Sequence, residues 1–314
     1  MTTIIVFGPT GHVGSAVALS AHSFGASKVV LAMRDTSKAI PGLTPDIESS
    51  RPYQRVQADL SDPASITSAV SSTGATRAFI YINHATQDHM LSAIQALQAG
   101  GITFVVFLST GSLRGDLHAV DQKDIISWSH AQVELNLQAE FGKENYVPIR
   151  PAFFATNSFW WKRMIPTGKV KVFAPDMKVD WITPGDIGRV SASVLLGGAK
   201  PGDEEAVWLI GPQKMSLRDG ITAIAKAAGK QVVIEEVGPE GGVEVYTENG
   251  TPRPVAELLV ESFGKLKAVQ EAGGDWLPDG EEWEAAVKVV ERYTGKPAMT
   301  LEEWAEEYKD EFRG

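Results

Sequence analysis

The sequence predicts an α/β fold: a doubly wound parallel sheet with helices on both faces, followed by a smaller C-terminal α/β lobe. Two observations carry this prediction. Short apolar runs alternate with longer segments of helical spacing along the N-terminal half of the chain, as in strands joined by crossover helices. The apolar runs also lack the regular polar alternation of half-exposed strands, which indicates strands buried on both faces of a parallel sheet.

Six apolar runs rich in Val, Ile and Phe are the expected strands: Ile4–Phe7, Val29–Ala32, Arg55–Ala58, Ala78–Ile82, Phe104–Leu108 and Tyr146–Ile149. Four segments of helical period lie between them and are the expected helices: Val13–Phe24, Pro63–Ser72, Gln87–Ala99 and Ile125–Phe141. The second helix has a clear start, because a Ser or Asp cap precedes Pro63 at the first helical turn.

After residue 150 the alternation of expected strands and helices becomes less regular, which indicates a second, smaller domain. We expect residues 1–150 to form the first domain, with 180–212 returning to it, and residues 151–180 and 213–314 to form the smaller lobe. Four residues of the tail lie close to one helical stripe: Leu301, Trp304, Tyr308 and Phe312. The stripe predicts that the last helix docks on a core through these side chains.

Composition and charge exclude several classes of protein. A net charge of -10 without a basic patch disfavours a nucleic-acid-binding surface. No apolar window is long enough to cross a membrane, the chain begins directly with an expected strand rather than a signal peptide, and cysteine is absent. The six histidines are too dispersed for a metal site. We therefore expect a cytoplasmic protein that binds no nucleic acid, membrane or metal; its oligomeric state stays open.

The first expected strand ends in the glycine-rich sequence GPTGHVG, with glycines at 8, 11 and 14. Gly8 permits a tight turn, Gly11 lets the backbone approach a pyrophosphate, and Gly14 lets the next helix pack closely on the strand. The free N–H groups and the dipole of the helix start would face the phosphates. In the first βα turn of a βαβ chain, this pattern predicts dinucleotide binding and a Rossmann-type fold.

The residue that follows the second expected strand indicates which dinucleotide is bound. NAD-selective folds usually place Asp or Glu there to bind the ribose 2′-hydroxyl, but this chain has Arg34, with Lys38 one helical turn later. An arginine suits bidentate contact with a 2′-phosphate. NADP(H) is therefore the expected cofactor, and the alternative is a solvated Arg34 that pairs with Asp35.

Six segments occur in the order and rough spacing of one family: GPTGHVG, AMRD, QADLSD, VVFLSTGS, IRPAFFATN and WITPGDIG. The chain thereby resembles the NmrA-like group of atypical short-chain dehydrogenases over essentially its whole length. The resemblance implies a Rossmann domain with a small α/β lobe, and usually NADP(H). It places Asp59 and Leu60 beside the adenine and Ser109 near the nicotinamide, although Asp59 is alternatively a contributor to the cap of the next helix. Four further residues complete the expected cofactor contacts: Thr10, His12, Val13 and Phe153.

The chain departs from the usual short-chain dehydrogenases at the catalytic position. It contains no Tyr-x-x-x-Lys pair. Many NmrA-like enzymes place a Lys four residues before a helical Glu, and here His130 occupies that position before Glu134. An imidazole there is able to bind a ribose hydroxyl or to act as a general acid near neutral pH. The alternative is an exposed helical histidine without a role.

A second polar cluster, Asn83 and His84, follows the fourth expected strand. In this fold the end of that strand points toward the cofactor cleft. Asn83 is therefore expected near the nicotinamide or the substrate, and His84 is a candidate proton donor. The alternative is that His84 merely caps the following helix. The expected catalytic residues are thus His130, Ser109, Asn83 and His84.

Seven large aromatic side chains gather around the segment after the sixth strand, which suits a bulky, flat or polycyclic ligand. The expected substrate-binding residues are Trp128, Phe154, Asn157, Trp160, Trp161 and Trp181. The alternative is that most of the seven rings form the core between the lobes and only two or so contact a ligand.

Three functions compete at this point. We expect an NADPH-dependent reductase of a bulky apolar metabolite, acting on C=N, C=C or C=O in alkaloid-like secondary metabolism. One alternative couples the reduction to a cyclisation or rearrangement on the same scaffold. The other is a non-catalytic regulator that senses NADP(H) and binds a protein partner.

Overall fold

The computed structural model describes residues 2–197 and 206–314. The chain forms two compact units. The first unit consists of Met1–Pro151, Pro184–Leu209 and Val289–Pro297, and the second of Ala152–Thr183, Ile210–Lys288 and Ala298–Gly314. Each unit has its own sheet and its own hydrophobic core, so each is described separately.

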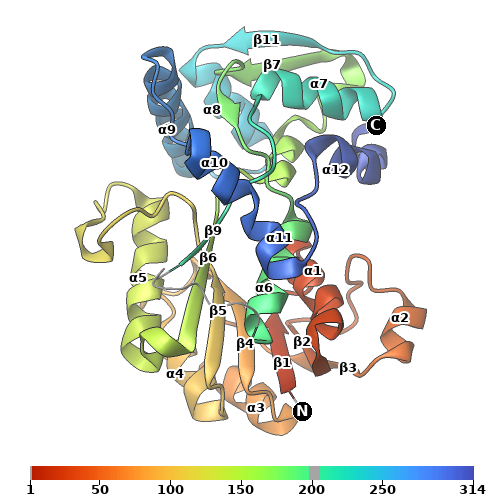
Figure 1. The fold of residues 1–314 in the computed structure, drawn as a ribbon, viewed down its shortest axis with the longest axis vertical. Helices are drawn as coiled ribbons and strands as arrows, with labels where there is room; N and C mark the ends of the chain where they lie inside the picture. The colour runs from red at the N-terminus through yellow and green to blue at the C-terminus, as the bar shows by residue number, and fades with distance from the viewer. Residues whose placement is uncertain (1, 198–205) are drawn as a thin grey trace. The chain divides into compact units, whose positions relative to one another are not determined.

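The first unit contains a seven-stranded sheet in the order β3-β2-β1-β4-β5-β6-β9 (Figure 1). Its strands are β1 (Thr2–Phe7), β2 (Ala26–Met33), β3 (Tyr53–Gln57), β4 (Arg77–Tyr81), β5 (Phe104–Leu108), β6 (Tyr146–Pro151) and β9 (Val207–Leu209). Every neighbouring pair is parallel. The order reverses between β1 and β4, which is the switch point of a doubly wound sheet.

The helices of the first unit are α1 (His12–Ala21), α2 (Pro45–Ser50), α3 (Pro63–Thr73), α4 (Leu91–Gly100), α5 (Ile125–Phe141), α6 (Pro184–Leu195) and α11 (Val289–Thr294). One face of the sheet packs on α3, α4 and α5 in a single apolar cluster that includes Ile5, Val105, Ile94 and Leu137. On the other face α6 packs on β4, β5 and β6, and α1 packs on β1 and β2. Helices on both faces confirm the predicted doubly wound α/β fold.

Local chemistry explains where the predicted helices begin and end. Asp62 caps α3 by accepting hydrogen bonds from the amides of Ala64 and Ser65, and Gly74 ends the helix with φ of +68°. Helix α5 has the predicted bounds. Helix α4 begins four residues later than expected, because His89 and Met90 adopt left-handed φ angles of 50° and 64° that break the helical path.

The second unit contains two small sheets and five α-helices among its described residues. Strand β7 (Lys169–Phe173) pairs in parallel with β11 (Val233–Val237), and β8 (Lys178–Val179) pairs antiparallel with β10 (Met215–Ser216). The helices are α7 (Leu217–Ala227), α8 (Pro239–Glu248), α9 (Arg253–Glu271), α10 (Gly280–Val287) and α12 (Leu301–Glu307). Thr300 and Glu303 form a capping box at the start of α12. Trp304 and Phe312 of the tail stripe are buried in the core of this unit.

The boundaries of the units differ from the expected ones at 181–183 and 210–212, which belong to the second unit, and at 289–297. We expected all of 213–314 in the smaller lobe, but residues 289–297 belong to the first unit. There α11 packs on α6, and the Ser193 hydroxyl donates to the Tyr293 carbonyl at 2.6 Å. The segment 180–212 was expected to return to the first domain, and its residues 184–209 belong to the first unit. Within that stretch, residues 198–205 lie outside the described residues.

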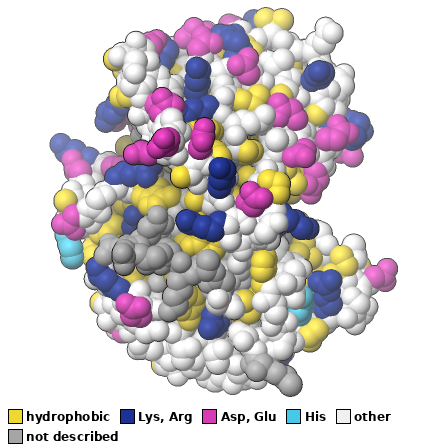
Figure 2. Space-filling view, viewed as in Figure 1, with side chains coloured by type: hydrophobic (Ala, Val, Ile, Leu, Met, Phe, Trp, Pro, Cys, Tyr) yellow, Lys and Arg dark blue, Asp and Glu magenta, His cyan; other side chains and the backbone are white. Residues whose placement is uncertain are grey.

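The distribution of charged side chains on the surface agrees with the prediction of no basic patch. On the face shown in Figure 2, basic side chains lie among acidic ones instead of gathering in one patch. In the described part of the chain, each helix is too short or too polar to cross a lipid bilayer.

Candidate functional site: the glycine turn and the carboxyl edge of the sheet

The glycine turn between β1 and α1 requires glycine at two of its three positions. Gly8 has a φ of +70°, and a Cβ there would lie 2.5 Å from Cε1 of Tyr81. A Cβ on Gly14 would lie 2.2 Å from the carbonyl oxygen of Gly8, which is closer than real Cβ contacts allow. At Gly11 the nearest atom would be that same oxygen at 3.5 Å. Local packing therefore explains Gly8 and Gly14, while Gly11 stays open to an approaching group.

The first turn of α1 offers backbone amides rather than side chains. Gly11 is the N-cap, and no side-chain hydrogen bond caps the helix. The first intrahelical hydrogen bond runs from the amide of Ser15 to the carbonyl of Gly11, so the amides of Val13 and Gly14 precede it. Val13 buries its side chain, and Thr10 and His12 are exposed. Such a helix start fits a pyrophosphate.

Arg34 lies just past the end of β2 and is exposed, as is Lys38. The expected alternative, an ion pair with Asp35, is not among the contacts of the described residues. The Asp35 carboxylate instead accepts hydrogen bonds from the Ser37 amide at 3.0 Å and the Ser37 hydroxyl at 2.6 Å. The Arg34 guanidinium is near enough to Asp59 to contribute to lowering the pKa of that carboxyl. Its position fits the 2′-phosphate of NADP(H).

Asp59 and Leu60 lie in the turn that follows β3, and their expected contact with the adenine stays a prediction. The Asp59 carboxylate accepts hydrogen bonds from the amide and hydroxyl of Ser61, which are the main causes of its lowered pKa. Asp62, not Asp59, caps α3. The side chain of Leu60 is buried in the apolar core under the sheet. Leu60 therefore presents only its backbone to a ligand.

Ser109, at the end of β5, belongs to a buried polar network. Its hydroxyl donates to Oε1 of Glu134 at 2.6 Å, and Arg150 donates to both oxygens of the same carboxylate. All three residues are buried. The Ser109 proton is thus engaged by Glu134 in this structure, and the expected catalytic role of Ser109 stays a prediction. The sequence indicated this network only by two charged residues in otherwise apolar segments.

His130 lies one helical turn before Glu134 on α5. It is 8% exposed, so it is not the exposed helical histidine that was the alternative. Its Nδ1 lies 2.8 Å from the carbonyl oxygen of Ile126. Burial, opposed by the hydrogen bond to Ile126, lowers the pKa of His130 to about 4. The lowered pKa disfavours the expected role of His130 as a general acid near neutral pH.

Asn83 and His84 lie in the turn after β4. The side-chain oxygen of Asn83 accepts a hydrogen bond from the Ala85 amide at 3.1 Å. The ring of His84 lies edge-on to His130, with 6.1 Å between ring centroids. Partial desolvation by its surroundings lowers the pKa of His84. Asp88, rather than His84, bonds the first turn of α4, at 2.9 Å from the Ser92 amide. The structure thus brings His84 and His130 together and removes the capping alternative.

The aromatic side chains divide into core residues and partly exposed ones. Trp161 and Trp181 are 0% and 1% exposed in the core of the second unit, so their expected contact with substrate is wrong in this structure. The ring of Phe153, expected at the cofactor, is buried beside Trp181 with centroids 5.1 Å apart. Four expected substrate residues are only partly buried: Trp128, Phe154, Asn157 and Trp160. Three of the rings, Phe153, Trp161 and Trp181, are thus core residues of the second unit, whereas the alternative expected a core between the lobes.

Sequence reasoning missed Asp180, which is fully buried in the second unit. Its carboxylate accepts hydrogen bonds from the amide of Phe153 at 2.9 Å and from that of Gly211 at 2.8 Å. These amides lie near the starts of the first two of the three segments that form this unit. Burial raises the pKa of Asp180 to about 6 despite those bonds. A lone Asp in the apolar run KVDWIT was the one available indication.

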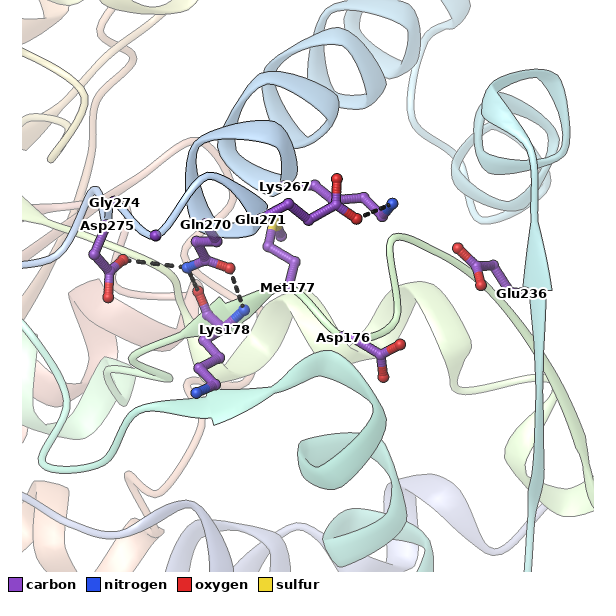
Figure 3. A pocket seen from close by; sticks show the side chains of 10 residues that line it. Asp176, Met177, Lys178, Glu236, Lys267, Gln270, Glu271, Gly274 and Asp275 are labelled. Atoms are coloured by element: carbon purple, nitrogen blue, oxygen red, sulfur yellow. Dashed lines mark hydrogen bonds and ion pairs between the residues drawn. The ribbon is translucent and has the colours of Figure 1, made fainter.

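The second unit also contains a cavity of about 480 Å³ that no sequence motif predicted (Figure 3). Its lining mixes acidic and basic side chains, including Asp176, Lys178, Lys267 and Glu271. Gln270 accepts a hydrogen bond from the Lys178 amide and donates one to the Lys178 carbonyl. Its amide is therefore occupied in holding the wall of the cavity. Among the described residues, no three His, Asp or Glu side chains form a group that could hold a metal ion.

Comparison with known proteins identifies the family. The model of the NmrA-like family matches residues 1–305. The nitrogen metabolite regulation-like protein bik4 of Gibberella fujikuroi is 36% identical, over 96% of this chain and 94% of that protein. A (4-alkanoyl-5-oxo-2,5-dihydrofuran-3-yl)methyl phosphate reductase of Streptomyces griseus is 25% identical, over 98% and 99%.

Among solved structures, an NADPH-dependent quinone oxidoreductase from Escherichia coli matches with a TM-score of 0.67 at 22% identity, over 97% of this chain and 98% of that one. This likeness supports the Rossmann-type fold. The family resemblance expected from the glycine turn and the Arg150-Pro151 motif is confirmed by the family model and by the relative from Gibberella. The chain belongs to the NmrA-like family.

Proposed function

We propose that the protein is an NADPH-dependent reductase of a bulky small molecule. The observation that carries the proposal is the pairing of the glycine turn with Arg34. The turn leaves Gly11 and the first amides of α1 open to a pyrophosphate, and the exposed guanidinium stands where a 2′-phosphate would be bound. When bound, NADPH supplies a hydride.

The residues near each part of the cofactor have distinct tasks in this proposal. Gly8 and Gly14 hold the turn, and the amides of the first turn of α1 bind the pyrophosphate. Arg34, with Lys38, holds the 2′-phosphate. The turn containing Asp59 and Leu60 borders the adenine. Asn83, His84 and His130 border the nicotinamide, because they lie at the carboxyl ends of the strands where Rossmann-type folds bind ligands.

The names of similar proteins support a reductase. The relative from Streptomyces is named a (4-alkanoyl-5-oxo-2,5-dihydrofuran-3-yl)methyl phosphate reductase, and the structural neighbour from Escherichia coli an NADPH-dependent quinone oxidoreductase. A bulky substrate is consistent with the partly exposed ring of Trp128 in the first unit. We retain a cytoplasmic role in secondary metabolism as part of the proposal, and nothing in the described site favours the cyclisation that the sequence left open.

A second candidate is a regulator that binds the dinucleotide without turnover. The relative from Gibberella is named as nitrogen metabolite regulation-like, and the Ser109 hydroxyl, which the family resemblance places near the nicotinamide, is held by Glu134. This candidate predicts cofactor binding but no hydride transfer to any small molecule.

Titration with NADPH, NADP⁺, NADH and NAD⁺, followed through tryptophan fluorescence, tests the proposal first. Tight binding of NADPH with strong discrimination against NADH supports it, and NADPH consumption in the presence of quinones, azo dyes or cyclic imines completes the test. Equal affinity for all four dinucleotides contradicts the role of Arg34. Selective binding without consumption favours the regulator.

A further inference from the structure

His130 has one tautomer available in its surroundings. The atom opposite Nδ1 is the carbonyl oxygen of Ile126, at 2.8 Å. A carbonyl only accepts hydrogen bonds, so Nδ1 carries the proton and donates it. In the neutral ring Nε2 is then left with a lone pair. The side chain therefore presents an acceptor, and no donor, to anything bound beside it.

The groups around His130 do not restore a proton donor. His84 faces it edge-on at 6.1 Å between centroids, and the ring of Phe107 lies at the same distance on the sheet side. Asp124, at the start of α5, is occupied by the Ser127 amide. Glu134 lies one helical turn further along α5, and its carboxylate holds the proton of Ser109. Desolvation holds the pKa of His84 below its ordinary value, so His84 does not replace the missing donor at neutral pH.

We propose, on the basis of the function proposed above, that Nε2 of His130 accepts a hydrogen bond from the substrate and that the preferred substrate is a protonated imine with an N–H group. Such a substrate brings its own proton to the site. Hydride adds to the imine carbon, the C=N π pair moves onto nitrogen, and the products are a neutral amine and NADP⁺. The step therefore balances without a general acid from the protein.

A matched pair of substrates isolates the hydrogen bond. Protonated 3,4-dihydroisoquinoline carries an N–H, and 2-methyl-3,4-dihydroisoquinolinium is a cation of similar shape without one. At about pH 6 His130 is still neutral, because its pKa is about 4. We expect kcat/KM to favour the N–H cation about tenfold in the natural protein. His130→Ala should reduce that preference to about twofold or less, and the exposed His118, changed to Ala, should leave it unchanged.

His130→Gln is a second variant in case the alanine variant does not fold. The glutamine amide oxygen accepts hydrogen bonds, so this variant should keep part of the preference. A natural protein that treats both cations alike, or a preference that survives His130→Ala, overturns the inference. A natural protein that does not bind NADPH refutes the proposed function itself. One that binds NADPH and reduces a quinone, but shows no N–H preference, refutes only the role of His130.

A measurement without turnover tests the same tautomer. In ¹⁵N-labelled protein, the His130 resonances, assigned by their loss in His130→Gln, should show a protonated Nδ1 and an unprotonated Nε2 at neutral pH. Adding the protonated imine in the presence of NADP⁺ should shift Nε2, and adding the methylated cation should not. A protonated Nε2 at neutral pH, or equal shifts with both cations, contradicts the inference.

Discussion

Arg150 forms a bidentate ion pair with Glu134, with Nε 3.0 Å from Oε1 and Nη2 2.5 Å from Oε2, and both side chains are buried. The pair joins β6 to α5, and the Ser109 hydroxyl adds the end of β5. A buried charge without its partner is costly. We expect Glu134→Gln or Arg150→Met alone to lower the free energy of unfolding by about 3–5 kcal/mol.

The double variant Glu134→Gln/Arg150→Met should be less destabilised than the sum of its two single changes, because it leaves no unpaired charge. Urea denaturation of the two single variants and the double variant measures this coupling. Additive losses would show that the pair is not a coupled unit.

The glycine turn predicts opposite outcomes for two similar substitutions. Gly14→Ala places a methyl group 2.2 Å from the Gly8 carbonyl oxygen, so it should destabilise the protein and disturb the turn. Gly11→Ala meets nothing closer than 3.5 Å, and φ at Gly11 is -89°, so the fold should tolerate it. The Gly11 variant should nevertheless bind NADPH at least tenfold more weakly, because its methyl group occupies the approach to the helix start. Thermal unfolding and fluorescence titration separate the two effects. Normal NADPH affinity in Gly11→Ala would contradict the assigned pyrophosphate site.

Arg34 should determine the choice between NADPH and NADH. Its exposed guanidinium follows β2 and is not engaged by Asp35, whose carboxylate is bonded to Ser37. We expect Arg34→Ala to weaken NADPH binding about 10- to 100-fold, the equivalent of a charge-assisted hydrogen bond, and to leave NADH binding within about twofold. The exposed Arg51 of the same unit, changed to Ala, is the control for loss of one positive charge. Equal weakening of both dinucleotides would place Arg34 elsewhere than at the 2′-phosphate.

Asp180 and His130 should shift stability with pH in opposite directions. The folded pKa of Asp180 is raised from 3.8 to about 6, so the folded state binds an extra proton in that window, and its stabilising contribution is lost as pH rises through 6. The folded pKa of His130 is lowered from 6.5 to about 4. Its contribution is present above pH 6.5 and is lost as pH falls toward 4.

The two groups therefore offset each other between about pH 4 and 6. Relative to the natural protein, Asp180→Asn should become more stable with rising pH across this window, and His130→Gln should become less stable. Each difference should change by at most about 1.4 kcal/mol per pH unit. Denaturation at several pH values between about 4 and 7 measures both slopes, and slopes of the same sign in the two variants would contradict the assigned pKa values.

The sequence by itself determined the features that depend on neighbouring residues. The buried strands and crossover helices follow from the period of apolar residues, which is local information, and so does the Asp62 cap of α3. The glycine turn was predictable because φ and close packing constrain those positions directly. The position of Arg34 just past β2 was predictable because the apolar run marks the end of that strand, and its contact with a 2′-phosphate stays a prediction.

Only the tertiary structure decided the chemistry at the carboxyl edge of the sheet. The position of the Ser109 hydroxyl proton depends on Glu134. The protonation state of His130 depends on its burial beside Phe107 and His84. Asp180 binds two amides that are 27 and 31 residues away in the chain. Whether a tryptophan such as Trp181 faces a ligand or a core also depends on distant segments. Proton positions, pKa values and burial arise from contacts between residues far apart in the sequence, and no local pattern encodes those contacts.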